Sequence, residues 1–189
     1  MQEQSHNRRV LLLAISLASW IFFMSGILAT SNDVLKPFLK ELFDLSQQQS
    51  SLAHFSFYIA YFFMAIPGGR LASTLGYRKA IPIGMTISFM GTLIGILGSY
   101  LEIFGLYLLA MFIMATGISV LVVIVNAYVA RIGSPNTATS RLNLVNAFYG
   151  LGAILGPIVG GNILLRENVS PESIHSLNLY LLFTCLTLI

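Results

Sequence analysis

Asp33 draws attention first, because it is a carboxylic acid at the end of a long apolar stretch of this 189-residue chain. Ionisable groups inside membrane spans are costly and mark functional sites. Gly26 and Thr30 precede Asp33 at helical spacing, which places the three residues on one helix face. Desolvation favours the neutral form of a carboxyl group, so Asp33 is a candidate proton carrier. The open alternative is that Asn32 and Asp33 only cap the helix at the membrane surface.

Amides and phenols form a second polar set within later apolar stretches. Asn126 lies in one stretch, and Asn146 lies in the next with Tyr149 three residues after it, so that pair shares a helix face. Such groups suit hydrogen bonds to an uncharged polyol. The alternative, equally open, is that the two amides bond each other across a helix interface for about 0.6 to 2 kcal/mol.

Aromatic side chains on a third stretch offer another kind of contact. His54, Tyr58 and Tyr61 recur at helical spacing and share one face. Aromatic rings stack on the apolar faces of sugars, which makes Tyr58 a candidate solute contact. They also anchor helices at the membrane surface, and this interfacial role is favoured for His54.

Composition indicates what must position these groups. The chain is 56% apolar and 9% charged, against about 25% charged in soluble domains, which excludes a water-soluble fold. One cysteine, Cys185, supplies neither a disulfide framework nor a metal cluster. We predict an all-α membrane protein with spans at the following residues: 10–33, 50–68, 80–99, 103–130, 142–165 and 176–189. The last run is too short to cross a bilayer, which needs about twenty residues, so we expect a truncated sixth helix.

Helix ends and loop charges set the expected topology. Lys36-Pro37 predicts the end of the first helix, and Ser46 predicts the N-cap of the second. Seven cations fall at the N-terminus and in alternate loops, against three on the other side, which predicts a cytoplasmic N-terminus. The seven are Arg8, Arg9, Arg70, Arg78, Lys79, Arg131 and Arg141, and the three are Lys36, Lys40 and Arg166.

Small residues recur on single faces of two predicted spans. The third span carries Gly84, Ser88, Gly91, Gly95 and Gly98, and the fifth carries Gly152, Gly156 and Gly160. Both patterns predict close contact between helices, because glycine lets backbones approach each other in a membrane.

Two motifs resemble those of the major facilitator superfamily. The segment Gly69-Arg-Leu-Ala-Ser-Thr-Leu-Gly76-Tyr-Arg78-Lys79 resembles the loop between the second and third helices of that family. Residues 152–161, with Pro157 after the second glycine, match its glycine-proline motif, which is best known in drug–proton antiporters. The resemblance implies that residues 1–189 are the N-terminal six-helix bundle of a twelve-helix transporter.

Further segments resemble the branch of L-fucose and glucose/galactose–proton symporters. They are Asn32-Asp33, Phe57-Tyr58-x-x-Tyr61-Phe62 and Arg141-Leu142-Asn143-Leu144. In the fucose symporter an Asn-Asp pair carries the coupling acid, which implies that role for Asp33. Asn126 and Asn146 match amides of that symporter, whereas Val122 fills the position of a second acid and Tyr149 that of a second amide.

The sequence therefore predicts proton-coupled symport of a sugar-like solute across the cell membrane by alternating access. A drug or metabolite–proton antiporter is the alternative, and a non-transport structural protein is a weaker one. We expect no enzymatic activity, since no nucleophile–base pair is evident, and no cofactor or metal, with the proton as coupling ion. The expected partners are the solute, the lipid bilayer and a C-terminal six-helix half, with no nucleic acid.

Overall fold

A computed structural model describes residues 2–166, 179, 181–182 and 184–185 of the chain. Residues 2–8, 32, 35–38, 41–42, 65 and 163–166 are described by their main chain alone. Five long helices make up the described part: α1 (Gln2–Leu42), α2 (Gln47–Leu75), α3 (Tyr77–Tyr100), α4 (Phe104–Arg131) and α5 (Ala138–Arg166). A short 3₁₀ turn, Pro135–Thr137, precedes α5.

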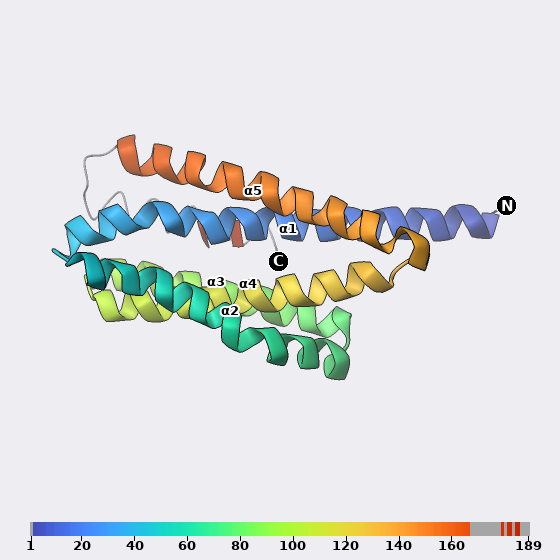
Figure 1. The fold of residues 1–189 in the computed structure, drawn as a ribbon, viewed down its shortest axis with the longest axis horizontal. Coiled ribbons are helices and arrows are strands. Elements are labelled where there is room, and N and C mark those ends of the chain that lie inside the picture. The colour runs from blue at the N-terminus through green and yellow to red at the C-terminus, as the bar shows by residue number, and fades with distance from the viewer. Residues whose placement is uncertain (1, 167–178, 180, 183, 186–189) are drawn as a thin grey trace.

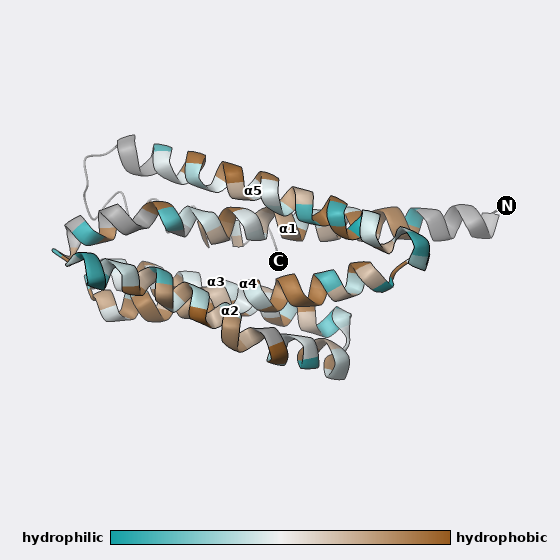
Figure 2. Ribbon diagram, viewed as in Figure 1, coloured by the Kyte–Doolittle hydropathy of each residue, from teal (hydrophilic) through white to brown (hydrophobic). Residues whose placement is uncertain are grey.

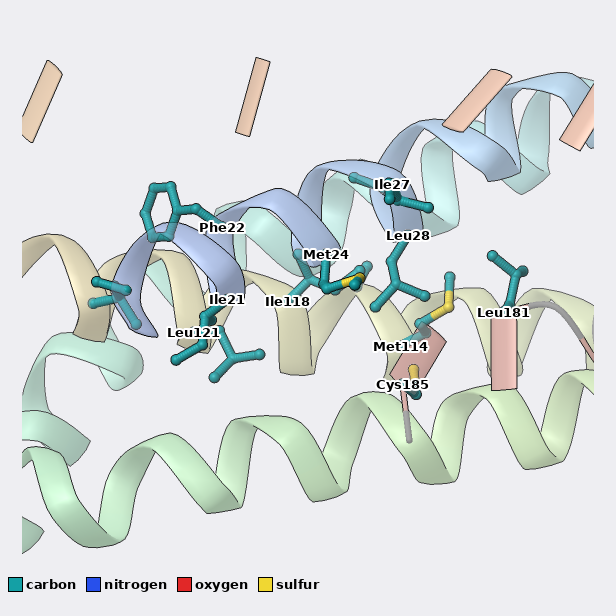
Figure 3. Packing of buried hydrophobic residues seen from close by; sticks show 14 of the residues in the cluster. Ile21, Phe22, Met24, Ile27, Leu28, Met114, Ile118, Leu121, Leu181 and Cys185 are labelled. Carbon is teal, nitrogen blue, oxygen red and sulfur yellow. The ribbon is translucent and has the colours of Figure 1, made fainter. Parts of the chain in front are cut away.

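The helices run up and down in two layers, with α1 and α5 in one layer and α2, α3 and α4 in the other (Figure 1). The N-terminus, the α2–α3 connection and the α4–α5 connection lie at the same end (Figure 1). The core fills the space between the layers, where Phe22 and Leu28 of α1 lie near Ile118 and Leu121 of α4 (Figure 3). All four side chains are almost fully buried.

In the described part of the chain, four helical segments are long and apolar enough to cross a membrane. They are Arg9–Ser31, Tyr77–Tyr100, Phe104–Arg131 and Pro135–Asn162, and α2 makes a fifth when its two bent parts count as one span. Figure 2 shows apolar residues along these helices, with hydrophilic residues mainly at the helix ends and connections. The protein is therefore built as a multi-pass membrane protein.

The first helix does not end at Pro37, and this prediction was wrong. Helix α1 continues to Leu42, because a proline removes one hydrogen bond of the helix without forcing the chain to turn. The chain turns later, where Asp44 adopts a φ of 47°. Ser46 then caps α2 in a complete capping box with Gln49, which confirms the predicted N-cap.

Helix α2 is bent by 47° between Gln47–Met64 and Ile66–Leu75. Pro67 lies just past this bend. Pro67 thus lies inside α2. It accounts for the bend, because a proline interrupts the hydrogen bonding of the preceding turn and kinks the helix.

Both glycine patterns form the predicted close contacts. On α3, a Cβ at Gly84 would lie 2.9 Å from the Leu121 side chain, and one at Gly91 would overlap the Met114 main chain. On α5, a Cβ at Gly152 would overlap the carbonyl oxygen of Phe23 in α1. The α3–α4 and α1–α5 helix pairs therefore pack backbone to backbone.

The loop motif is shorter than its sequence suggests, because α2 extends to Leu75 and α3 begins at Tyr77. Gly76 alone connects them, with a φ of 73°. This left-handed conformation favours glycine, since a Cβ would be strained there. Its amide donates to the carbonyl of Ala72 and so closes α2.

Candidate functional site

The side chains of Asp33 and His54 contact each other between α1 and α2. The Nδ1 atom of His54 lies 3.3 Å from Oδ1 of Asp33. The side chains are 30% exposed for His54 and 43% exposed for Asp33, so the pair is partly enclosed and still reached by water. The Asp33 side chain contacts the next helix, which sequence reasoning did not foresee, while the side chain of Asn32 lies outside the described part of the structure.

Aromatic side chains continue from this pair along α2. The ring of His54 stacks on that of Tyr58, with centroids 6.3 Å apart and planes inclined by 19°. Tyr61, one turn further, is half-buried, and its buried hydroxyl faces that of Tyr149 on α5 without a hydrogen bond of ordinary geometry. The Tyr149 ring packs edge-on against Phe22 of the core.

Asn126 and Asn146 lie side by side at the far end of this series. Nδ2 of Asn146 donates to Oδ1 of Asn126 at 3.2 Å and to the carbonyl of Leu142 at 2.8 Å. The two amides therefore make the interhelical bond that was one of the two sequence interpretations. Asn146 is exposed and Asn126 is half-buried, so the pair remains accessible from one side.

We call the connected series the polar track. Its members come from α1, α2, α4 and α5, and they are Asp33, His54, Tyr58, Tyr61, Tyr149, Asn146 and Asn126. Asp33 and Tyr58 lie close enough to Tyr149 to interact with it electrostatically. The track thus has a charged end at α1 and α2 and an uncharged amide end at α4 and α5.

The polar stripe expected to lead to Asp33 has a different role. Gly26 contacts the main chain of Tyr149, and the Thr30 side chain contacts Gly156, so this face of α1 is the packing surface for α5. The Thr30 hydroxyl donates to the carbonyl of Gly26 in its own helix at 2.9 Å. At the far end of the stripe, the Asp33 side chain instead reaches the polar side chain of His54 in α2.

The residues of the first family motif lie at the α2–α3 connection, away from the polar track. Those of the glycine-proline motif lie on α5, where it packs against α1. Gly69 and Gly76 have open space where a Cβ would be, and Arg78 lines a groove between α1, α3 and α4, while Lys79 is exposed. Gly152, Gly156 and Gly160 are buried, and Pro157 is half-buried within an unbroken α5.

Arg141 is a buried cation that sequence reasoning counted only as a loop charge. Its guanidinium donates to the carbonyls of Val129 and Ser134, at 3.2 and 2.9 Å, and also to the Thr137 hydroxyl. A weaker bond reaches the carbonyl of Ala130. Arg141 therefore closes the C-terminal end of α4, where free carbonyls and the helix dipole favour a cation. The described residues contain no cluster of three His, Cys, Asp or Glu side chains fit for a metal.

A sequence profile of the Major Facilitator Superfamily matches residues 11–189. The chain belongs to this superfamily. The predicted all-α bundle of the major facilitator fold is also confirmed by the crystal structure of the Escherichia coli fucose:proton symporter FucP (N162A). That structure aligns with a TM-score of 0.74 and 26% identity, over 94% of this chain and 48% of the symporter chain. FucP in the outward conformation aligns with a TM-score of 0.73.

Curated relatives are sugar transporters. A glucose/galactose transporter of Brucella abortus is 36% identical over 152 residues, which are 80% of this chain and 37% of the relative. The L-fucose-proton symporter of Escherichia coli is 28% identical over 173 residues, which are 92% of this chain and 39% of the relative. The chain thus spans about two fifths of the length of these relatives.

Proposed function

We propose that this chain forms the N-terminal six-helix half of a proton-coupled symporter for a sugar-like solute in the cell membrane. In this proposal a second six-helix half faces it, and the two halves rock about a central site to give alternating access. The N-terminus lies in the cytoplasm, on the side of the seven cations. The proton is the coupling ion, and the protein has neither a cofactor nor an enzymatic activity.

The observation that carries the proposal is the division of the polar track into a charged end and an uncharged end. A symporter needs one group that gains and loses a proton, and the Asp33 carboxylate, paired with His54, supplies it. It also needs neutral hydrogen-bonding groups for the solute. The bonded amides of Asn126 and Asn146 supply those on neighbouring helices.

The bonding of the two amides leaves groups free for a hydroxyl. Both N–H groups of Asn146 are used, by Asn126 and by the carbonyl of Leu142. The carbonyl of Asn146 and the amino group of Asn126 remain, so the pair presents one acceptor beside one donor. A sugar hydroxyl both donates and accepts, and it can therefore bond to both groups at once. Tyr58, which is 57% exposed, adds an aromatic surface at the charged end of the track.

Symport is better supported than the antiport alternative. The relatives are named as glucose/galactose transporters and L-fucose-proton symporters. The glycine-proline motif of α5, which suggested antiport, lies against α1 as a packing surface. Its residues therefore explain helix packing whatever the direction of transport.

The test replaces Asp33 in the complete transporter. We expect Asp33→Asn to abolish accumulation driven by a pH gradient, because the amide cannot bind the coupling proton, while exchange of labelled solute across the membrane persists. The measurement is uptake of labelled glucose, galactose and fucose into proteoliposomes, with and without an imposed gradient.

Asp44→Asn is the matched control, since it makes the same chemical change at an exposed position on the same side of the membrane. It should accumulate solute like the wild type. Uphill uptake by Asp33→Asn at the wild-type level would refute proton coupling at Asp33. Failure of the wild type to take up any of the three sugars would refute the sugar-like solute.

A further inference from the structure

The imidazole of His54 lies against the carboxylate of Asp33. His54 lies seven residues into α2, about 10 Å from its first residue at 1.5 Å per residue. Its Nδ1 atom points at the Asp33 carboxylate, 3.3 Å away on the neighbouring helix. The contact therefore joins the two helices at the one carboxylate to which the proposed function assigns the proton.

The geometry holds the ring in place for this contact. Tyr58 stacks on the imidazole at nearly parallel planes, which fixes the ring orientation. Phe57 packs edge-on against Tyr58 and is itself buried. A ring held on one face by an aromatic neighbour keeps its nitrogen directed at the carboxylate, as a positioned proton acceptor must be.

We infer that His54 is a second proton-binding residue of the transporter, and that its imidazole and the Asp33 carboxylate together hold one coupling proton. The inference rests on the proposed proton coupling at Asp33 and deepens it. The proton comes from the outer water, adds to the pair and leaves to the inner water. No bond between heavier atoms forms or breaks, and the net charge of the pair changes from −1 to 0.

This change of charge explains how protonation permits closure. An isolated anion is expensive to enclose away from water, whereas a hydrogen-bonded pair without net charge is much less so. Two groups this close titrate as one unit. The imidazole nitrogen gives the pair a second site for the proton besides the carboxylate, so its loss lowers the affinity of the pair for that proton.

The other titratable groups around the pair, among the described side chains, are phenols. Tyr58 faces it from α2, and Tyr149 faces it from α5. Lys40 is directed elsewhere, since its ammonium donates to the side chain of Gln47 at 3.2 Å. Among the described side chains, His54 is thus the base that contacts Asp33.

The experiment measures the pH profile of proton-driven sugar uptake by the complete transporter with His54→Gln. Glutamine keeps a polar side chain that can hydrogen-bond to Asp33, but its amide cannot take up the coupling proton. We expect the pH of half-maximal accumulation to move toward acid by at least about one pH unit. Uptake at the acid optimum and solute exchange should stay within about twofold of the wild type. His54→Asn, with a smaller amide, is the second variant and should shift the profile in the same direction.

Ser51→Ala is the matched control on the same helix, because its hydroxyl bonds to the carbonyl of Gln47 in α2. It should leave the profile in place. A His54→Gln or His54→Asn profile that falls in height without moving would show a structural role and overturn the inference. So would an equal shift in Ser51→Ala. These failures differ from failure of the proposed function, in which Asp33→Asn itself would retain uphill uptake.

Discussion

The two glycine interfaces of the bundle look alike in sequence and differ in what they hold. At the α3–α4 interface, Gly84 and Gly91 lie against Leu121 and Met114. At the α1–α5 interface, Gly26 lies against the main chain of Tyr149. These contacts of the first interface therefore involve no member of the polar track, whereas the second interface fixes one.

The difference shows that a small-residue pattern specifies a distance between backbones and not a role. Helix α1 carries Asp33, and helix α5 carries Tyr149 and Asn146. Their close contact through Gly26, Gly152 and Gly156 therefore sets the spacing between the two ends of the polar track. Helix α3 contributes no member to the track, so the α3–α4 contact supports the bundle alone.

The largest effect is expected from Arg141, which joins α4 of one interface to α5 of the other. Arg141→Met removes the donors of two main-chain carbonyls at the end of α4 and of the Ser134 carbonyl in the α4–α5 connection. Charged hydrogen bonds contribute about 1.5 to 3 kcal/mol each, and unsatisfied buried carbonyls add a cost, so we expect a loss of about 3 kcal/mol or more. Unfolding in mixed detergent micelles measures it. Arg131→Met, at an exposed position of α4, should change stability by less than about 0.5 kcal/mol. Equal losses of stability in Arg141→Met and Arg131→Met would show that Arg141 does not cap α4.

The second prediction separates the two interfaces directly. Gly26→Ala and Gly91→Ala each place a Cβ against main-chain atoms of the facing helix. Overpacking of this kind costs about 1 to 3 kcal/mol, so both variants should lose stability. Gly26→Ala should also raise the KM for solute, because the displaced main chain belongs to Tyr149. Gly91→Ala should leave the KM of the folded fraction unchanged. Equal changes of KM in both variants would contradict the proposed difference between the two interfaces.

A smaller effect of opposite sign is expected one turn along α5 from Asn146. Gly150 has nothing within 4 Å of its Cβ position, although Gly152 two residues later is in tight contact. Gly150→Ala should therefore be neutral or stabilise the protein by up to about 1 kcal/mol through helix propensity. Gly152→Ala should destabilise it. Thermal unfolding of the two variants in one detergent compares them, and a loss in Gly150→Ala would place that residue in a contact.

The smallest effect is expected at Thr30 in the α1–α5 interface. Its hydroxyl bonds to Gly26 of its own helix, a local bond that adds little. Thr30→Val keeps the shape of the side chain, so stability and transport should change by no more than about 0.5 kcal/mol and twofold. A larger loss of transport in the uptake assay would make the Thr30 hydroxyl part of the site.

Local features were predictable from sequence, and contacts between distant segments were not. Ser46 and Gln49 form their capping box within one turn, so the pattern contains all the information that the cap needs. Helical spacing likewise identified the packing faces of α3 and α5. The bonding of Asp33 to His54 depends on how α1 and α2 pack, and no spacing rule gives that arrangement.

Two misjudgements have identifiable physical causes. Pro37 was expected to end α1, but the local cost of one lost hydrogen bond did not outweigh continuation of the helix to Leu42. The face with Gly26 and Thr30 resembled a polar stripe because both residues are small or hydroxylated. Small size decides packing in a membrane helix, and the hydroxyl is satisfied within its own turn.

The single-residue connection at Gly76 has a mechanical consequence. Between Leu75 and Tyr77 there is no slack, so the last part of α2, Ile66–Leu75, and the start of α3 behave as one angled lever. Ala72 and Ala80, on the two arms of this lever, pack against the same residues of α4. A swing of the lever must therefore be absorbed at the bend near Pro67. The first part of α2, Gln47–Met64, carries His54 and Tyr58. It can therefore pivot while the second part, Ile66–Leu75, stays packed against α3 and α4.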